Sequence, residues 1–167
     1  MSAPAPTFAV RRYVGPKVSD VPEGGRYIGE FGGRSIGILN VEGRFHAFLN
    51  RCPHLSGPLC EGEVLGLVYA DGPGNLKFAP ERKMLTCPWH GWEFDLETGR
   101  SYVNPSRLRA RRIPVEVENG KRVVEQLADG SVVQLVRGPY TAEVFEVSVE
   151  DEYLVIAVRE QVREATP

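Results

Sequence analysis

The sequence predicts an all-β protein, built as an antiparallel sandwich or barrel. Short runs of β-favouring residues recur along the chain, and turn residues such as Gly, Pro, Asn and Asp separate them. No segment repeats apolar residues over a long stretch at the 3.6-residue period of a helix. Many short strands with regular turn signals are typical of sandwiches and barrels, so little helix is expected.

The first half of the chain contains four of these predicted strands. They cover residues 8–14, 26–31, 34–41 and 44–49. Gly15-Pro16 is expected to end the first strand. Glu42-Gly43 lies between two β-favouring runs and predicts a hairpin.

The second half continues the same pattern. Strands are predicted over residues 92–96, 111–117, 123–127, 132–136, 143–149 and 153–158. Glu118-Asn119-Gly120 predicts a turn, and Asp129-Gly130 predicts a hairpin. Residues 1–7 and 161–167 are expected to be tails around a single domain of residues 8–160.

The composition is that of an ordinary globular protein. The 167 residues are 42% hydrophobic and 25% charged, with a formal net charge of −2. This charge gives no reason to expect nucleic acid or an anionic membrane as a partner, and no run of about 18 apolar residues could span a bilayer. The first residues show no secretion signal, and three cysteines are too few for a disulfide framework. A cytoplasmic protein is therefore expected.

Two short stretches each combine a cysteine with a histidine. The first contains Cys52-Pro53-His54, and the second contains Cys87-Pro88-Trp89-His90. Together they hold two of the three histidines in the chain. A soft thiolate paired with a borderline imidazole is typical of a metal site. The proline after each cysteine fixes φ and removes an N–H, which stiffens a loop that must present two ligands.

A structural zinc site and a thiol-based enzyme both account poorly for the two stretches. A structural zinc site also uses two cysteines and two histidines, but its usual Cys-x-x-Cys and His-x-x-x-His spacing is absent. A thiol-based enzyme has no use for two matching pairs of cysteine and histidine. Of these two, zinc is the stronger alternative that the residues leave open.

The two stretches resemble those of the Rieske family, in which two cysteines hold one iron of a 2Fe-2S cluster and two histidines hold the other. The resemblance implies one 2Fe-2S cluster per chain, bound by Cys52, His54, Cys87 and His90. It also implies the antiparallel Rieske fold, in which a β-sandwich or barrel base carries a small cluster-binding subdomain, here about residues 50–106. Against the family pattern, residues 61–83 are an insertion in that subdomain. The predicted hairpin of residues 123–136 is a second addition, unless the core ends at Leu127 and the tail is the addition.

Four positions separate this chain from the high-potential members that it resembles. Those members carry two more cysteines, which form a disulfide between the loops, and the corresponding residues here are Gly57 and Trp89. They also place serine and tyrosine hydroxyls against the cluster sulfurs, where this chain has Trp92 and Phe94. Fewer donors to sulfur stabilise the added electron less. The resemblance therefore implies a potential near the low end of the Rieske range, about −150 mV.

The expected function is one-electron transfer. The catalytic subunit of a ring-hydroxylating oxygenase needs a further iron held by two histidines and a carboxylate, and only His46 remains for such a site. The resemblance implies a standalone Rieske ferredoxin that takes electrons from a flavin-dependent reductase and passes them to an oxygenase. It is not expected to be a catalyst alone. The alternatives are a permanently bound small subunit of a larger oxidoreductase and a non-redox binding module.

Several residues near the two stretches have competing interpretations. Cys60 is expected to be a buried apolar thiol, and His46 a packing or surface residue. The indoles of Trp89 and Trp92 either shield the cluster or form a landing surface for a partner, and shielding is favoured. Asn104-Pro105-Ser106 is either a third loop that covers the cluster or a plain turn.

A local group of basic residues follows the second stretch. It consists of Arg107, Arg109, Arg111 and Arg112. A solvated strand face is favoured over a docking surface for these arginines.

Overall fold

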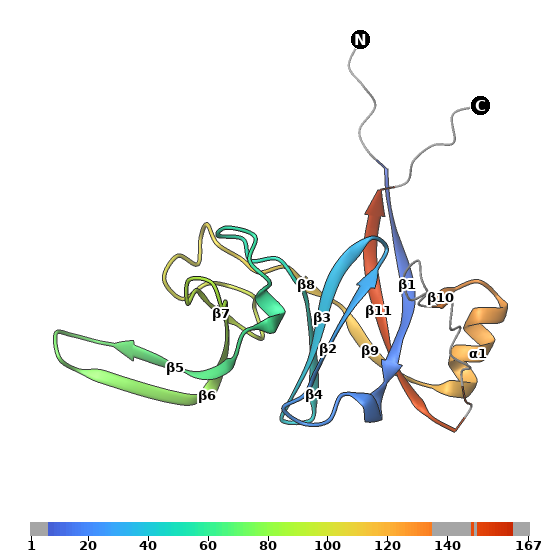
Figure 1. Cartoon of the computed structure of the whole chain (residues 1–167), viewed down its shortest axis with the longest axis horizontal. Coiled ribbons are helices and arrows are strands. Elements are labelled where there is room, and N and C mark those ends of the chain that lie inside the picture. The colour runs from blue at the N-terminus through green and yellow to red at the C-terminus, as the bar shows by residue number, and fades with distance from the viewer. Residues whose placement is uncertain (1–6, 135–147, 149, 162–167) are drawn as a thin grey trace, which may run out of the picture.

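The computed structural model describes residues 7–134, 148 and 150–161. Figure 1 shows two parts, a base of two four-stranded sheets and a smaller lobe on one side, formed by residues 50–111. We call this second part the small lobe. No helix within the described residues has the length and apolar character that crossing a bilayer requires.

The first sheet of the base is a meander that is closed by a short fourth strand. Its strands are β2 (Arg26–Phe31), β3 (Arg34–Val41), β4 (Arg44–Leu49) and β8 (Arg112–Ile113), in that spatial order. The first three match the predicted strands. Glu42 and Gly43 both adopt positive φ, at 54° and 76°, as a two-residue hairpin turn requires.

The second sheet of the base combines both ends of the described chain. Its strands are β10 (Val132–Gln134), β1 (Phe8–Lys17), β11 (Glu152–Gln161) and β9 (Val115–Asn119), in that spatial order. β11 includes the predicted strand 153–158. Phe31, Ile36 and Ile38 from the first sheet pack with Leu154 and Ile156 from β11 in the main core of the base. The antiparallel all-β fold is therefore confirmed.

The predicted strand over residues 123–127 is wrong, because this segment is part of α1 (Gly120–Ala128). Asn119 does not form the predicted turn but caps the helix, since its side-chain oxygen accepts a hydrogen bond from the Arg122 N–H at 2.9 Å. The predicted hairpin at Asp129-Gly130 is also wrong. β10 follows the helix and pairs in parallel with β1.

Three smaller differences concern strand ends. Gly15-Pro16 does not end β1, which continues to Lys17 through a register shift against β11. The predicted strand 111–117 is split into β8 and β9 at Pro114. The predicted strand 143–149 lies outside the described residues apart from Ser148, and so does the end of the predicted strand 132–136.

The small lobe contains a three-stranded sheet. Its strands are β5 (Val64–Ala70), β6 (Leu76–Thr86) and β7 (Glu93–Asp95). β5 and β6 form a long hairpin that projects away from the base (Figure 1). Its turn lies at residues 71–75, where Asp71-Gly72-Pro73-Gly74 supplies residues that favour turns. Two of the cross-strand pairs, Val68 with Phe78 and Ala70 with Leu76, are exposed on one apolar face.

Two short 3-10 helices complete the described elements. They are η1 (Val18–Asp20) and η2 (Leu59–Glu61). η2 is buried at the junction of the base and the small lobe, where Leu59 and Cys60 pack with Leu39 of β3 and Phe48 of β4. Side chains of the first sheet of the base therefore contribute to the interior of the small lobe.

Candidate metal centre

The two Cys and His stretches form loops with the same backbone design. In loop 1 the Cys52 N–H donates to the Gly57 carbonyl at 2.8 Å, and the Ser56 N–H donates to the Cys52 carbonyl at 2.8 Å. In loop 2 the Cys87 N–H donates to the Trp92 carbonyl at 2.8 Å, and the Gly91 N–H donates to the Cys87 carbonyl at 3.0 Å. The backbone of each cysteine is therefore hydrogen-bonded to the residues four and five positions after it.

The residue four positions after the cysteine has the same backbone conformation in both loops. Ser56 has φ of 63° and Gly91 has φ of 66°, both in the left-handed region. Glycine enters this region without strain, and a serine there is uncommon. The loops differ in the place of the histidine, which is two positions after Cys52 but three positions after Cys87.

The loops bring like residues together. The centres of the His54 and His90 rings are 5.1 Å apart with the ring planes at 88°. Cys52 and Cys87 are both 2% exposed and belong to one buried cluster. Burial raises the pKa of Cys52, the nearby Cys87 thiol raises it further, and the backbone amides of His54 and Leu55 lower it. The site thus offers a sulfur pair inside and an imidazole pair outside.

One ring nitrogen of this site is buried and has no hydrogen-bond partner among the described residues. His54 Nδ1 has no hydrogen bond with any described group, although it is removed from solvent. A buried polar atom of this kind is costly unless something binds it, and a metal ion satisfies an imidazole nitrogen. With two sulfurs beside two imidazoles, the residues present fit a 2Fe-2S cluster of mixed ligation.

η2 supports both loops from the base side. The Asn50 side-chain oxygen accepts from the Cys60 N–H at 2.8 Å, and Arg26 of β2 donates to the carbonyls of Cys60 and Gly62 at 2.9 and 2.6 Å. Gly62 lies against the Thr86 carbonyl, directly before loop 2, so closely that a Cβ would overlap that oxygen. The segment from Cys60 to Gly62 therefore fixes the start of loop 2 relative to the base.

The sequence alone does not identify Arg26, Asn50 or Gly62 as part of the site. Asn50 stands between β4 and loop 1, where a polar residue at a strand end can be recognised. Arg26 contacts residues more than 30 positions away, and no local pattern reveals such a pairing.

The positions that lack the bridging cysteines lie next to each other. The Trp89 ring packs on Gly57, and a Cβ at Gly57 would lie 2.8 Å from that ring. The three cysteines of the chain are free. A non-covalent contact between an indole and a glycine therefore joins the loops at this point.

The two tryptophans have different environments. Trp92 is half-buried, with its ring centre 5.1 Å from that of His54, so it can exclude water from the inner side of the imidazole pair. Trp89 is 58% exposed beside His90. Its location at the outer surface agrees better with a landing surface than with the favoured shielding role.

Cys60 and His46 are also buried, and they belong neither to the cysteine pair nor to the histidine pair. Cys60 is fully buried, and burial raises the pKa of its thiol to about 12, so the group stays protonated. His46 is buried in β4, as a packing residue would be, and burial lowers its pKa. Asn104-Pro105-Ser106 forms a turn in which the Asn104 carbonyl accepts from the Leu108 N–H at 2.9 Å.

Comparison with known proteins agrees with this geometry. The sequence matches the family described as Rieske [2Fe-2S] domain over residues 11–114. The ferredoxin component of the alkene monooxygenase system of Xanthobacter autotrophicus is 29% identical over 107 residues, which are 64% of this chain and 75% of that protein. The ferredoxin component of the naphthalene 1,2-dioxygenase/salicylate 5-hydroxylase systems of a Ralstonia species is 26% identical over 102 residues, 61% of this chain and 83% of that protein.

A solved structure extends the likeness of fold to nearly the whole chain. It comes from Mycobacterium tuberculosis and is assigned as the small subunit of an NADH-dependent nitrite reductase. The identity is 16% and the TM-score 0.51, over 98% of this chain and 100% of that one.

Proposed function

The chain belongs to the Rieske family, and from that premise we propose that it is a one-electron carrier whose 2Fe-2S cluster is held by Cys52, His54, Cys87 and His90. The observation that carries this proposal is the convergence of two loops of the same design. They pair the two cysteines inside and the two histidines, with ring centres 5.1 Å apart, outside. When bound, such a cluster accepts and releases one electron at a time.

The chain's own residues give each ligand a separate task. Cys52 and Cys87 would bind one iron as thiolates, and the amides of His54 and Leu55 near Cys52 favour that charged form. His54 and His90 would bind the second iron. His90 is exposed, so a partner protein can approach this edge of the site. The inner face of the site is closed by Trp92 and the buried segment around Cys60.

The ferredoxin relatives belong to oxygenase systems, and we propose an oxygenase as the electron acceptor and a flavin-dependent reductase as the donor. A small, transient contact suits such a carrier. The free cysteines are consistent with a reducing compartment, and we propose the cytoplasm. Because Trp92 and Phe94 provide no hydroxyl for the cluster sulfurs, we propose a potential near the low end of the Rieske range, about −150 mV.

Electron paramagnetic resonance of the dithionite-reduced protein, together with metal analysis, tests the cluster. We expect two irons per chain and a Rieske signal with a low average g value. Zinc in place of iron would overturn the proposal.

Replacing one ligand tests the proposed set directly. In His90→Cys an anionic thiolate replaces a neutral imidazole, which disfavours the added electron, so the potential should fall wherever the cluster assembles. Protein-film voltammetry measures this shift, and His46→Cys is the control for a histidine outside the set. An unchanged potential in His90→Cys would remove His90 from the ligands.

One observation favours a second candidate function, a permanently bound small subunit of a larger oxidoreductase. The β5–β6 hairpin exposes Val68, Ala70, Leu76 and Phe78 on one face, and permanent subunits cover such faces in their complexes. Size-exclusion chromatography with light scattering distinguishes the two functions. A monodisperse monomer supports the carrier, and aggregation of the isolated chain supports the subunit.

A further inference from the structure

Five arginines lie close together in the chain and are all exposed. They are Arg100, Arg107, Arg109, Arg111 and Arg112, and we call them the basic strip. They account for five of the 20 Lys and Arg residues of a chain whose formal net charge is −2. The strip is therefore a local concentration of positive charge on an otherwise acidic protein.

The basic strip differs from most of the other described cationic residues in its partners. Eight lysines and arginines elsewhere lie within 4.0 Å of a carboxylate. Within the described residues, none of the five arginines of the strip has such a partner. Their charge is therefore not neutralised by the described part of the chain and is available to another molecule.

The arrangement of the strip lowers the stability of the fold. Arg100 and Arg109 face each other across an isolated antiparallel bridge, and like charges in directly opposite positions destabilise a sheet. Two of the guanidinium groups are held in place by backbone oxygens. Arg109 Nε donates to the Thr98 carbonyl at 3.1 Å, and Arg112 donates to the Glu97 carbonyl. Two of the five positive charges are thus held in place at this surface. None of the five has a carboxylate within 4.0 Å among the described residues.

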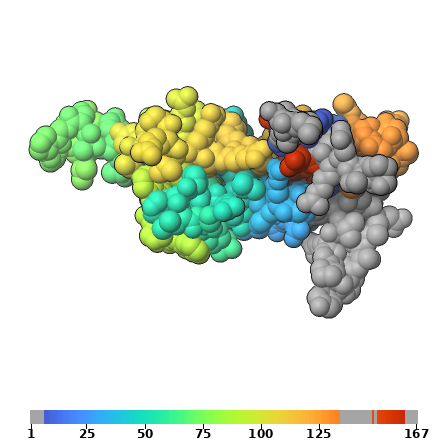
Figure 2. Space-filling model, turned by 90° about the horizontal axis from the view of Figure 1, so that it is seen from above, coloured from blue at the N-terminus to red at the C-terminus, as the bar shows by residue number. Residues whose placement is uncertain are grey.

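Backbone hydrogen bonds connect the strip to the strands that flank loop 1 and loop 2, which we call the ligand loops. The Asp95 N–H donates to the Arg100 carbonyl at 2.9 Å, and Asp95 ends the strand that follows loop 2. The Leu49 N–H donates to the Arg111 carbonyl at 2.9 Å, and Leu49 ends the strand that precedes loop 1. Figure 2 shows this segment, in yellow, as a continuous band along the small lobe toward the base.

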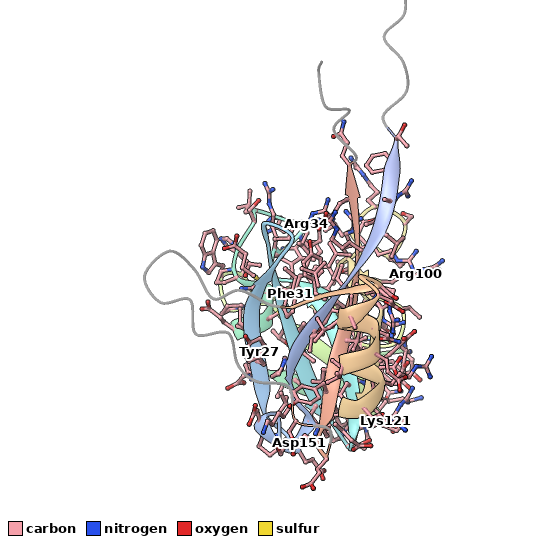
Figure 3. The ribbon with its side chains drawn as sticks, turned by 90° about the vertical axis from the view of Figure 1, so that its right-hand side faces the viewer. Tyr27, Phe31, Arg34, Arg100, Lys121 and Asp151 are labelled. Carbon is pink, nitrogen blue, oxygen red and sulfur yellow. The ribbon has the colours of Figure 1, made fainter. Side chains whose placement is uncertain are left out.

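The shape of the strip suits a macromolecular surface. Residues 109–112 line an open hollow of about 360 Å³, and three of these four residues are arginines. Figure 3 shows Arg100 on the opposite side of the view from Tyr27. A surface of this kind attracts and orients an oppositely charged partner more than it binds a small ligand.

We propose that the basic strip docks an acidic surface of a redox partner protein and orients it toward the ligand loops. This inference rests on the proposed electron-carrier function. The strip increases the rate of encounter, and the attraction weakens as salt screens the charges.

The test reverses three charges of the strip. Arg100→Glu, Arg107→Glu and Arg111→Glu are combined, because these side chains form no hydrogen bond with a described group. Lys77→Glu, Lys121→Glu and Arg122→Glu form the matched control, which changes the net charge equally on the hairpin and on α1. Cytochrome b5, an acidic haem protein, is the probe, and basic cytochrome c is the opposite-charge comparison.

Stopped-flow absorbance measures reduction of each cytochrome by the dithionite-reduced protein at low and high salt. We expect the reversed strip to slow reduction of cytochrome b5 by about tenfold or more at low salt and to speed reduction of cytochrome c. The control should change either rate less than threefold. Equal effects of the strip variant and the control would overturn the docking proposal, since only net charge would then matter.

Calorimetric titration with cytochrome b5 tests docking independently of electron transfer. Salt-sensitive binding that the strip variant loses and the control keeps would support the proposal even if the protein held no cluster. Binding that both variants keep would overturn it. Preferential binding of a 20-base-pair DNA duplex over cytochrome b5 would also overturn it, because the strip would then serve nucleic acid.

Discussion

At the scale of single residues, close contacts explain why particular small or neutral side chains stand around the ligand loops. Gly37 of β3 lies directly on Cys60, and Gly62 lies on the Thr86 carbonyl. The sequence predicts that Cys60 is a buried thiol but does not show what it touches. The partner is 23 positions away on another element, and a glycine gives no sign of which side chain covers it.

Gly37→Ala should destabilise the fold, because a Cβ there overlaps the Cys60 Cβ. Overpacking of this kind costs about 1 to 3 kcal/mol of the free energy of unfolding, which urea denaturation measures. Combining Gly37→Ala with Cys60→Gly should recover part of the loss, because the opposing Cβ is removed. Gly72→Ala is the control, since its Cβ meets open space. A Gly37→Ala variant as stable as the parent would contradict the contact.

His46 should make stability depend on pH. Its pKa is lowered in the folded state, first by burial and then by Arg112 and Arg44, while Glu97 opposes the shift. Above the ordinary pKa of about 6.5 both states are neutral and the full stability is present. As pH falls below that value, the unfolded chain binds a proton more readily, so stability is lost until the lower folded pKa is passed.

The His46→Phe variant isolates this effect, since it keeps an aromatic ring and removes the titration. Thermal melting by circular dichroism at several pH values between 7.5 and 5 should show a shallower loss of stability in the variant. The two proteins share every other titratable group, so the remaining pH dependence cancels in the comparison. Parallel pH profiles would contradict the assignment.

At the scale of elements, local patterns predicted the strands and failed at the helix. The hairpin of β3 and β4 was predictable because Glu42-Gly43 stands between alternating β-favouring runs. α1 was missed because Val123 and Val124 favour strands, and because asparagine is common both in turns and at helix N-caps. The helix buries Val123 and Gln126 against the base, so tertiary packing overrides the local preference. The parallel pairing of β10 with β1 joins distant segments and has no local signal.

Removing the cap should weaken α1. Asn119→Ala deletes the oxygen that accepts from the Arg122 N–H and should lower the free energy of unfolding by about 1 kcal/mol. Asn119→Asp, which keeps a capping oxygen, should lose much less. The midpoint of urea denaturation compares the two variants, and an equal loss in both would show that the cap is not the cause.

At the scale of the whole molecule, the structure packs the two Cys and His loops against the first sheet of the base. Cys52, Cys87 and Cys60 pack with Leu39 and Phe48 of the base. The meeting of the two Cys and His loops was predictable, because their residue types and spacing are specific. The hydrogen bonds from Arg26 to the segment that contains η2 were not predictable, since they depend on how the base and the small lobe meet.

We propose that residues 61–83 are an addition within the cluster-binding subdomain of residues 50–106, and a shortened hairpin tests this. Leu67 and Ala79 face each other across β5 and β6, so residues 68–78 can be replaced by Asn-Gly, which favours a two-residue turn. The shortened chain should keep the iron content and reduced-state spectrum of the parent, because the removed residues lie beyond Leu67, Ala79 and Met84. Loss of iron would assign the hairpin to the support of the site.

The shared backbone design of the two ligand loops has a consequence for the speed of electron transfer. Each cysteine amide is already bonded within its own loop, and η2 ties the start of loop 2 to the base. A scaffold that is closed in this way has little freedom to relax when charge arrives or leaves. The reorganisation energy of the protein around the electron should therefore be small, and self-exchange between reduced and oxidised chains should be limited by their encounter.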